Sequence, residues 1–375
     1  MSLLQKIEGE NEQIIDLLRE LIERESPSNQ KNLVDVLGAF IVDWLRDQSL
    51  SPQVLPRKNV GDIIWAEWGK EQSGRILVLC HIDTVWPAGS LEQNPFRIED
   101  GRIYGPGSYD MKGGIASTLK IQEYLNRGWI NPSKKVRFLY TTDEELTSSH
   151  SRKVIEEFAR ESDAVLVTEP PLSGGELKTA RKGVGSYVIK VYGKSAHSGV
   201  EPEKGIDAIE ELTKRIGEIR SIPLQEKETT VTVTQIHGGT AINTVAEYAE
   251  AVIDTRFNNK EAADQVDKAL RALQPEVPGV RLEVEGGIDR YPMVKTDGSQ
   301  ELFKKAQGIA TELGFDLGEG STGGGSDGNF TSALDIPTLD GLGIPGDGAH
   351  AWHEHVRVNQ LAPRIALLAL LIERL

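Results

Sequence analysis

Apolar residues recur at helical spacing in two stretches near the start of the chain, residues 7–24 and 31–48, and Ser26-Pro27-Ser28 separates them. Apolar, strand-like runs follow at 62–68, 75–80, 135–141 and 163–168, with helical patterns at 111–127 and 151–162. This alternation of strands and helices predicts a doubly wound sheet covered by helices on both faces.

The rhythm changes from about residue 185. A strand pattern (185–192) is followed by a helix (203–220), two strands (229–237 and 245–257), a helix (260–274) and a strand (280–285). That order is the split β-α-β arrangement of a ferredoxin-like module, and the α/β pattern resumes after about residue 290. We therefore predict an α/β protein in which residues 1–181 and 289–375 form one discontinuous domain, with a mixed, mostly parallel sheet between helices. An inserted ferredoxin-like α+β domain of residues 182–288 interrupts it.

Composition excludes several classes of partner. A net charge of -15 over 375 residues repels phosphate backbones, so we expect no nucleic-acid partner. The single cysteine, Cys80, excludes an internal disulfide framework, and the polar amino terminus does not resemble a signal peptide, so we expect a cytoplasmic protein. The longest apolar stretch, 365–372, is far shorter than the roughly 20 residues that cross a bilayer, so we expect no membrane association.

Polar residues with metal-binding side chains follow several of the predicted strands. The carboxyl ends of strands are where open α/β sheets gather their sites. A helix cap or a solvated loop explains one such residue but not the whole set, which comprises His81, Asp83, Glu144, Glu145 and Glu169, with Asp110 before a helix and His350 near the carboxyl end.

This mixture of imidazole and carboxylate groups suits two divalent ions, most naturally zinc, with cobalt or manganese as alternatives. Carboxylates crowded together repel one another unless cations lie among them. Asp110 is the candidate bridge between two ions, and Asp83 is placed to orient His81. Glu144 and Glu145 are adjacent, so in an extended chain one could ligate while the other serves as general base; chemistry alone does not say which.

Eight stretches occur together in the order of a known family. They are CHIDTVWPAG, YGPGSYDMKGG, TTDEELTSS, VTEP, GKSAHSG, NTVAEYAEAVIDTRF, TGGGSD and LGIPGDGAH. Over nearly its whole length the chain resembles the zinc aminoacylase and carboxypeptidase family, which includes glutamate carboxypeptidase, acetylornithine deacetylase and succinyl-diaminopimelate desuccinylase. Among these members, glutamate carboxypeptidase is most similar in the stretches CHIDTVWPAG, TGGGSD and LGIPGDGAH.

The resemblance implies a role for each candidate. One zinc ion would be held by His81, Asp110 and Glu169, and the other by Asp110, Glu145 and His350. Glu144 would be the general base and Asp83 the residue behind His81. The inserted domain would be a lid and dimerisation module of a homodimer, with His197 reaching the partner's active site. From the residues alone, a turn histidine is the favoured interpretation of His197.

The expected activity is hydrolysis of an amide bond in a small peptide or N-acyl amino acid that carries a free carboxylate. A carboxypeptidase of the glutamate carboxypeptidase type is the first reading, an N-acyl-amino-acid deacylase the second, and an inactive binding protein of the same fold a third. Candidate substrate-binding residues are Asn243, Arg256, Arg290 and Gly324. Their alternatives are a turn residue, an ion-pair partner, a surface arginine and a flexible glycine. His353 and His355 closely follow the preferred ligand His350 in the sequence, and we assign them no metal.

Overall fold

The computed structural model describes residues 1–69, 74–224 and 228–375, and it divides the chain into two compact units. The first unit comprises Met1–Ala180, Lys295–Thr322 and Ser326–Leu375, and the second comprises Arg181–Val294 and Gly323–Gly325. Where the sequence predicts an inserted domain of residues 182–288, the second compact unit runs six residues further at its carboxyl end and adds the glycine loop.

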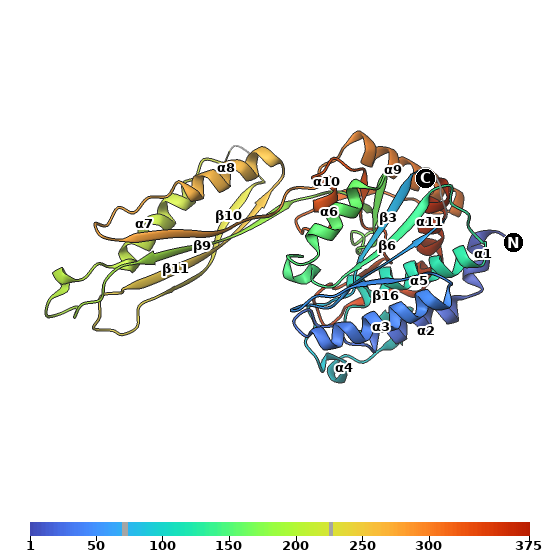
Figure 1. The fold of residues 1–375 in the computed structure, drawn as a ribbon, viewed down its shortest axis with the longest axis horizontal. Coiled ribbons are helices and arrows are strands. Elements are labelled where there is room, and N and C mark those ends of the chain that lie inside the picture. Colours follow the sequence, from blue (N-terminus) through green and yellow to red (C-terminus); the bar gives the residue numbers. More distant parts are fainter. Residues whose placement is uncertain (70–73, 225–227) are drawn as a thin grey trace. The chain divides into compact units, whose positions relative to one another are not determined.

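A six-stranded sheet forms the centre of the first unit, in the order β1-β2-β6-β3-β7-β14. Figure 1 labels β3 and β6 in the middle of this sheet. The pairs β3·β6, β3·β7 and β7·β14 are parallel, whereas β1·β2 and β2·β6 are antiparallel. The sheet is therefore mixed and mostly parallel, as the sequence predicts. Its strands are β1 (Gln53–Leu55), β2 (Ile63–Trp68), β3 (Arg75–His81), β6 (Lys135–Thr141), β7 (Ala164–Val167) and β14 (Thr338–Leu339).

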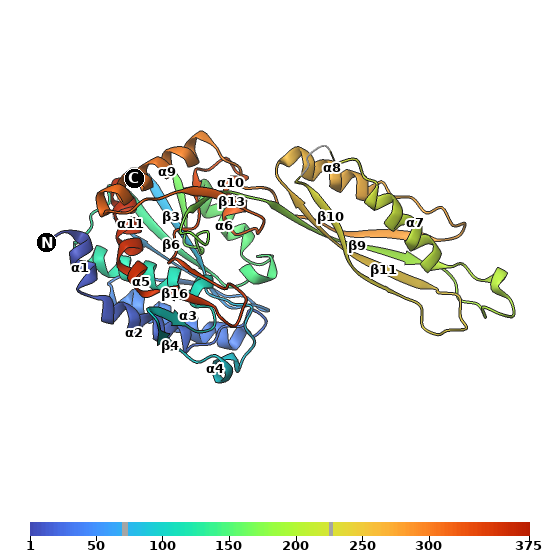
Figure 2. The same ribbon diagram turned by 180° about the vertical axis from the view of Figure 1, so that it is seen from behind.

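Helices cover both faces of this sheet because successive strand side chains point to opposite faces. Ile76, Val78 and Cys80 of β3 belong to the larger core, together with apolar residues of α1, α2, α3, α5, α9 and α11. Leu77 and Leu79 belong to a smaller core with residues of α6 and α10. Figures 1 and 2 show these two layers, whose helices are α1 (Leu3–Glu8), α2 (Asn11–Ile22), α3 (Lys31–Asp47), α5 (Gly113–Asn126), α6 (Arg152–Arg160), α9 (Asp297–Leu313), α10 (Gly328–Ser332) and α11 (Leu361–Arg374).

Two small sheets and several short helices complete the first unit. The strands β15 (Gly346–Asp347), β16 (His355–Arg357), β5 (Arg102–Tyr104) and β4 (Arg97–Glu99) form one sheet in that order, and β13 (Glu319–Thr322) pairs with β8 (Leu177–Arg181). The short helices are α4 (Ser90–Gln93), the π-helix η1 (Ser108–Lys112) and the 3₁₀ helices η2 (Glu144–Leu146) and η4 (Val358–Gln360).

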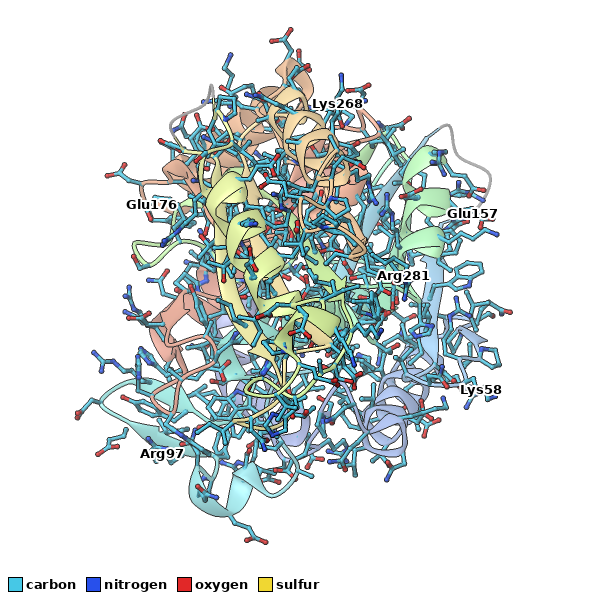
Figure 3. All side chains as sticks on the ribbon, turned by 90° about the vertical axis from the view of Figure 1, so that its left-hand side faces the viewer. Lys58, Arg97, Glu157, Glu176, Lys268 and Arg281 are labelled. Atoms are coloured by element: carbon cyan, nitrogen blue, oxygen red, sulfur yellow. The ribbon has the colours of Figure 1, made fainter. Side chains whose placement is uncertain are left out.

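The second unit is a four-stranded antiparallel sheet in the order β10-β11-β9-β12, which is the strand order of a split β-α-β module. Apolar residues of α7 and α8 pack on one face of this sheet. Figure 3 labels Lys268 on α8 and Arg281 at the start of β12. Along β11 buried and partly exposed residues alternate strictly, so the other face is partly solvated. The elements are β9 (Gly183–Tyr192), η3 (Pro202–Lys204), α7 (Ala208–Arg220), β10 (Thr230–Gly238), β11 (Tyr248–Phe257), α8 (Lys260–Arg271) and β12 (Arg281–Arg290).

Two predicted helices have different limits in the structure. The single helix predicted over 7–24 is wrong: it is two helices, and the chain turns at Gly9 and Glu10 between them. The helix predicted from residue 203 begins at Ala208, because the Asp207 carboxylate caps it by accepting hydrogen bonds from the Ile209 and Glu210 amides.

Candidate metal centre

Three parallel strands bring the first candidate residues to one edge of the central sheet. The strand β3 is buried along almost its whole length and ends at His81, whose side chain is buried. Its neighbours β6 and β7 are in register with it and lead into the segments that carry Glu144 and Glu169. Because the three strands run in the same direction, their carboxyl ends meet at one place.

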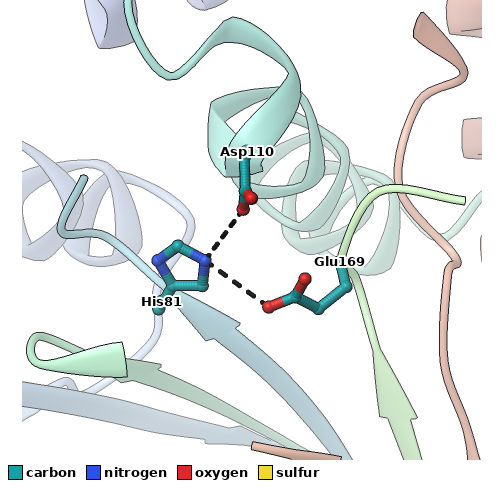
Figure 4. A group of neighbouring side chains, drawn as sticks. All are labelled: His81, Asp110 and Glu169. Carbon is teal, nitrogen blue, oxygen red and sulfur yellow. Dashed lines mark hydrogen bonds and ion pairs between the residues drawn. The ribbon is translucent and has the colours of Figure 1, made fainter. Parts of the chain in front are cut away.

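One group of possible ligands consists of His81, Asp110 and Glu169 (Figure 4). The Nε2 atom of His81 lies 3.2 Å from Oδ1 of Asp110 and 3.5 Å from Oε1 of Glu169. The dashed lines in Figure 4 meet at this one nitrogen, so a single ion lying among the three side chains could contact all of them.

A second group shares the same aspartate. The Nε2 atom of His350 lies 3.5 Å from Oδ2 of Asp110 and 3.4 Å from Oε2 of Glu145. Each oxygen of Asp110 therefore faces a different imidazole, which is the arrangement that a carboxylate bridging two ions requires. His350 has a positive φ of 63°, an uncommon backbone conformation for a residue other than glycine, and it directs the ring from a tight turn.

A buried carboxylate holds the loop that carries Asp110. Glu354 accepts hydrogen bonds from the backbone amides of Gly107 (2.8 Å), Tyr109 (2.9 Å) and Asp110 (2.9 Å), and from the indole of Trp86 (2.6 Å). Its side chain is fully buried. Four donors to one carboxylate fix the backbone from which the Asp110 side chain projects.

Asp83 holds both the imidazole of His81 and the turn with the two glutamates. Its carbonyl oxygen lies 2.9 Å from Nδ1 of His81, and its carboxylate Oδ1 lies 3.5 Å from the same nitrogen. The carboxylate also accepts hydrogen bonds from the amides of Glu144 and Glu145, both at 3.2 Å. With Nδ1 facing these oxygens, Nε2 of His81 is the atom directed at Asp110 and Glu169.

The sequence suggested that Glu144 and Glu145 lie in an extended chain, but in the structure they are not extended. They begin the 3₁₀ helix η2, because Asp83 draws both amides toward itself. The Glu145 carboxylate faces His350. Glu144 is buried at the same edge of the sheet.

The carboxylates around the two histidines favour the protonated, positively charged form of each imidazole. Burial of the His81 ring opposes its protonation, yet hydrogen bonds to Asp110 and Asp83 raise the pKa of His81 well above its usual value. Hydrogen bonds to Asp110 and Glu145 raise the pKa of His350 to about 10. A divalent cation would replace these protons, since a histidine must be neutral to ligate.

The two carboxylates of the second group respond in opposite directions. Burial favours the neutral acid, but the two imidazoles hold the pKa of Asp110 well below its usual range. Burial raises the pKa of Glu145, and the nearby Asp110 carboxylate adds to this effect. Oε1 of Glu145 is buried and has no hydrogen-bond partner within the described parts of the chain. A cation would satisfy a buried acceptor of this kind, so the donor set fits a pair of divalent ions.

The remaining predicted residues belong to the second unit. His197 and Asn243 lie in neighbouring segments: Ser198 donates its amide to the Asn243 carbonyl at 2.9 Å, and both His197 and Asn243 are exposed. Nδ1 of His197 accepts a hydrogen bond from the Gly199 amide at 3.1 Å. A neutral imidazole that accepts at Nδ1 carries its proton on Nε2, so Nε2 is a donor.

Arg256, Arg290 and Gly324 have different surroundings. The Arg256 guanidinium binds both oxygens of Asp254, at 2.9 and 3.0 Å. Arg290, expected at the surface by default, is buried at the end of β12. The Gly324 carbonyl accepts from Arg181 at 3.2 Å, and a side chain at this exposed glycine would meet nothing within 4 Å.

The sequence did not single out Glu354. It lies between His353 and His355, and nothing in the spacing separates a buried acceptor from a solvated glutamate. Glu354, His355 and Val356 are all buried, so no alternation along the chain marks Glu354 either. His355 packs its ring 5.2 Å from that of Tyr104, and neither His353 nor His355 joins the two ligand groups found among the described residues.

Comparison with known proteins defines the class. The sequence pattern of peptidase family M20/M25/M40 matches residues 77–374, and the chain belongs to this family. It is therefore a hydrolase of the metallopeptidase and amidohydrolase class.

Individual relatives share most of its length. The chain is 29% identical to carboxypeptidase G2 from Pseudomonas sp. (strain RS-16), over 99% of this chain and 91% of the relative. It is 28% identical to succinyl-diaminopimelate desuccinylase from Acinetobacter baumannii (strain AYE), over 84% and 86% of the two chains.

Solved structures share the fold. An M20 family metallo-carboxypeptidase from Sulfolobus solfataricus superposes with a TM-score of 0.77 at 18% identity, covering 96% of this chain and 98% of the other. A dinuclear metal binding peptidase from Bacillus subtilis gives a TM-score of 0.68 at 19% identity, covering 98% of both chains. Among the residues that the structure describes, no helix is long and apolar enough to span a membrane.

Proposed function

We propose that this protein is a zinc-dependent amidohydrolase with two metal ions per chain, which releases a free amino acid from a small peptide or N-acyl amino acid. The observation that carries the proposal is Asp110, whose two carboxylate oxygens face two imidazoles from two separate ligand groups. His81 and Glu169 would complete one metal site, and His350 and Glu145 the other. When bound, the ions would polarise the amide carbonyl and acidify a water molecule.

The protein's own residues would move the protons. Glu144, buried at the edge of the sheet where the ligands meet, would take a proton from the attacking water and return it to the leaving nitrogen. Asp83 would hold His81 in the tautomer that leaves Nε2 free for a metal ion. His197, with Nε2 as a donor, would stabilise the oxyanion of the tetrahedral intermediate.

The substrate would carry a free carboxylate, for which an arginine fork is the natural partner. Arg256 is the first candidate because it already binds a carboxylate, that of Asp254, through two nitrogens. Arg290, Asn243 and the backbone at Gly324 remain candidates for the rest of the substrate. The likeness to carboxypeptidase G2 over 99% of the chain supports carboxypeptidase activity, and the likeness to a desuccinylase supports deacylation as the second candidate.

The test is a substrate panel on protein stripped of metal and then reloaded with zinc, cobalt or manganese. We expect about two ions per chain by elemental analysis and activity that returns with the second equivalent. Dipeptides with a free carboxyl terminus, their amides, and N-acetyl and N-succinyl amino acids separate the two candidates. Full activity in metal-free protein would exclude this mechanism, and two bound ions with no hydrolysis of any substrate would favour a binding protein.

We further propose a homodimer formed through the second unit. The strand β10 is at an edge of its sheet, and uncovered edges are usually paired or protected. Ile236 on this strand and Ile209 on α7 are both substantially exposed. If His197 acts in the partner's site, mixing His197→Ala subunits with Glu144→Gln subunits should restore part of the activity. No recovery in verified heterodimers would show that His197 acts within its own chain.

A further inference from the structure

Arg364 is a buried cation in the first turn of α11. Its exposed fraction is 2%, and burial lowers the pKa of its guanidinium to about 10, so the group is still charged at neutral pH. The amino terminus of a helix is also the positive end of its dipole, which disfavours a cation there. Two unfavourable effects at one residue call for contacts that offset them.

The contacts that offset them are backbone carbonyls from two chain segments. The Arg364 guanidinium donates to the carbonyl oxygen of Gly175 at 2.9 Å, and to those of Gly341 and Gly343 at 3.4 Å each. Within the described residues, its hydrogen bonds all go to these carbonyls. A guanidinium is a planar fork with five N–H groups, so one side chain can hold two segments together.

Both segments adjoin the metal-ligand candidate Glu169, whose carboxylate faces His81 in Figure 4. The Gly343 amide donates to the Glu169 carbonyl at 2.9 Å. The two backbones are in close contact, because a Cβ at Gly343 would lie 2.6 Å from the Thr168 carbonyl oxygen and 2.8 Å from that of Glu169. Gly175 lies in the loop that follows Glu169. The guanidinium therefore joins the segment that binds the Glu169 backbone to the loop that continues from it.

The second ligand group is held by other contacts. The Glu145 amide donates to the Asp83 carboxylate, and His350 lies in the turn between β15 and β16. Neither the hydrogen bond nor the strand pairing uses a carbonyl that Arg364 binds. Loss of the guanidinium should therefore loosen Glu169 and leave Glu145 and His350 in place.

We propose that Arg364 is a positioning residue for Glu169, and that it sets the affinity of the metal site formed by His81, Asp110 and Glu169 without itself being a ligand. The guanidinium fixes the backbone from which the Glu169 carboxylate projects. Loss of a contact that orients a ligand in this way lowers metal affinity by about 10- to 100-fold. This role rests on the proposed metal binding and is independent of which amide is the substrate.

The test is a titration of metal-free protein with cobalt(II), whose visible absorption depends on the coordination geometry of each site. Arg364→Met keeps an unbranched side chain but removes the guanidinium. Glu169→Gln and Glu145→Gln each lack a ligand of one site, so their spectra identify the two sites. In Arg364→Met the affinity of the Glu169 site should fall about 10- to 100-fold while the other site keeps its affinity. At one equivalent of cobalt its spectrum should match that of Glu169→Gln.

Arg374→Met is the matched control, because Arg374 lies in the last turn of the same helix and pairs with Glu312 at 2.7 Å. It should titrate like the unmodified protein. Arg364→Lys keeps the buried charge but not the planar fork, so its Glu169 site should be weaker by about threefold or more. If Arg364→Met does not fold, Arg364→Lys decides the question by the same titration.

Three results would overturn the role of Arg364. One is full affinity of the Glu169 site in either Arg364 variant; in the lysine variant it would mean that charge alone suffices. The others are equal weakening of both sites and a spectrum that matches Glu145→Gln. If the unmodified protein binds no divalent ion, the proposed function fails and the positioning role fails with it. If cobalt binds with the expected pattern but no amide is hydrolysed, the positioning role stands without the activity.

Discussion

Most candidate functional residues of the first unit are buried or partly buried, with His350 as the exposed exception, whereas most of those in the second unit are exposed or partly exposed, with Arg290 as the buried exception. In the first unit His81, Asp83, Glu144 and Glu169 are all buried, and several are held by hydrogen bonds from neighbouring segments. In the second unit His197 and Asn243 are exposed on loops, and Arg256 lies on a partly solvated sheet.

The difference follows from what each group has to do. Charges crowded for metal binding repel one another, so they need a rigid frame of strand ends and backbone donors that fixes them before any ion arrives. Groups that read a variable substrate gain from adaptable surface positions. We therefore expect changes in the first unit to alter turnover and metal affinity, and changes at the substrate-binding candidates of the second unit to alter KM; His197, the proposed oxyanion donor, is the exception and should alter turnover.

The largest effect should come from Glu144→Gln. Removing the proton acceptor while keeping the side-chain shape should lower kcat by about 10²- to 10⁴-fold and leave both metal ions bound. Steady-state kinetics and elemental analysis check the two parts. Glu145→Gln is the matched control because it should lose one of the two ions. If Glu144→Gln loses an ion and Glu145→Gln keeps both, the roles of the two residues are reversed.

A smaller effect is expected from Glu354→Gln. A glutamine offers one acceptor oxygen in place of two and turns an NH₂ group toward amide donors, so the loop that bears Asp110 loses its fixed geometry. Zinc affinity should fall about 10- to 100-fold, as competition with a chromophoric chelator would show. Glu92→Gln, an exposed glutamate on α4, should bind zinc normally. Unchanged affinity in Glu354→Gln would mean that the loop holds its shape without the carboxylate.

The second unit should respond through substrate binding. Arg256→Ala should raise KM for a substrate with a free carboxylate by about tenfold and leave KM for the corresponding amide nearly unchanged, because a charge-assisted contact is lost. Arg281→Ala, an exposed arginine at the start of β12, is the control. If Arg256→Ala and Arg290→Ala both keep the wild-type discrimination between carboxylate and amide, neither arginine reads the carboxylate.

The central sheet and the convergence of its strand ends can be predicted from the sequence, because both depend on local patterns. An apolar run such as Ile76 to Cys80 can only be a buried strand when the segments around it alternate with helices, and parallel strands must end at one edge. The prediction that His81 and Glu169 lie together needs nothing more. The order of elements in the second unit follows in the same way.

What the sequence could not give depends on contacts between distant segments. The Glu354 carboxylate accepts hydrogen bonds from backbone amides about 245 residues earlier in the sequence, and no local pattern of residues identifies it. The turn of Glu144 and Glu145 into a 3₁₀ helix is imposed by Asp83 from another strand end. The break between α1 and α2 falls at Glu10, whose carboxylate is drawn to cations on α5 and just beyond it.

That last contact gives the smallest predicted effect, on stability rather than activity. Glu10 contacts Lys120 at 2.9 Å and Arg127 at 2.5 Å, and Lys120 is itself buried. Burial of Glu10 favours its neutral form, but the two cations hold its pKa below the usual value. A carboxyl whose pKa is lower in the folded state stabilises the fold above the pKa of the unfolded chain, about 4.3, and this contribution is lost as the pH falls through the folded value.

Glu10→Gln should therefore lower the unfolding free energy by about 2 kcal/mol at pH 7, and the difference from the unmodified protein should shrink as the pH falls below about 4. Urea unfolding at several pH values measures it. Glu12→Gln, at an exposed glutamate in the first turn of α2, should show no such loss.

Hydrogen exchange then sharpens the contrast between the units. Amides of α2 and α5 should exchange faster in Glu10→Gln, whereas those of α7 in the second unit, where Arg215 has its own carboxylate partners Glu211 and Glu276, should keep their rates. Faster exchange in α7 as well would mean that the two units unfold as one cooperative body.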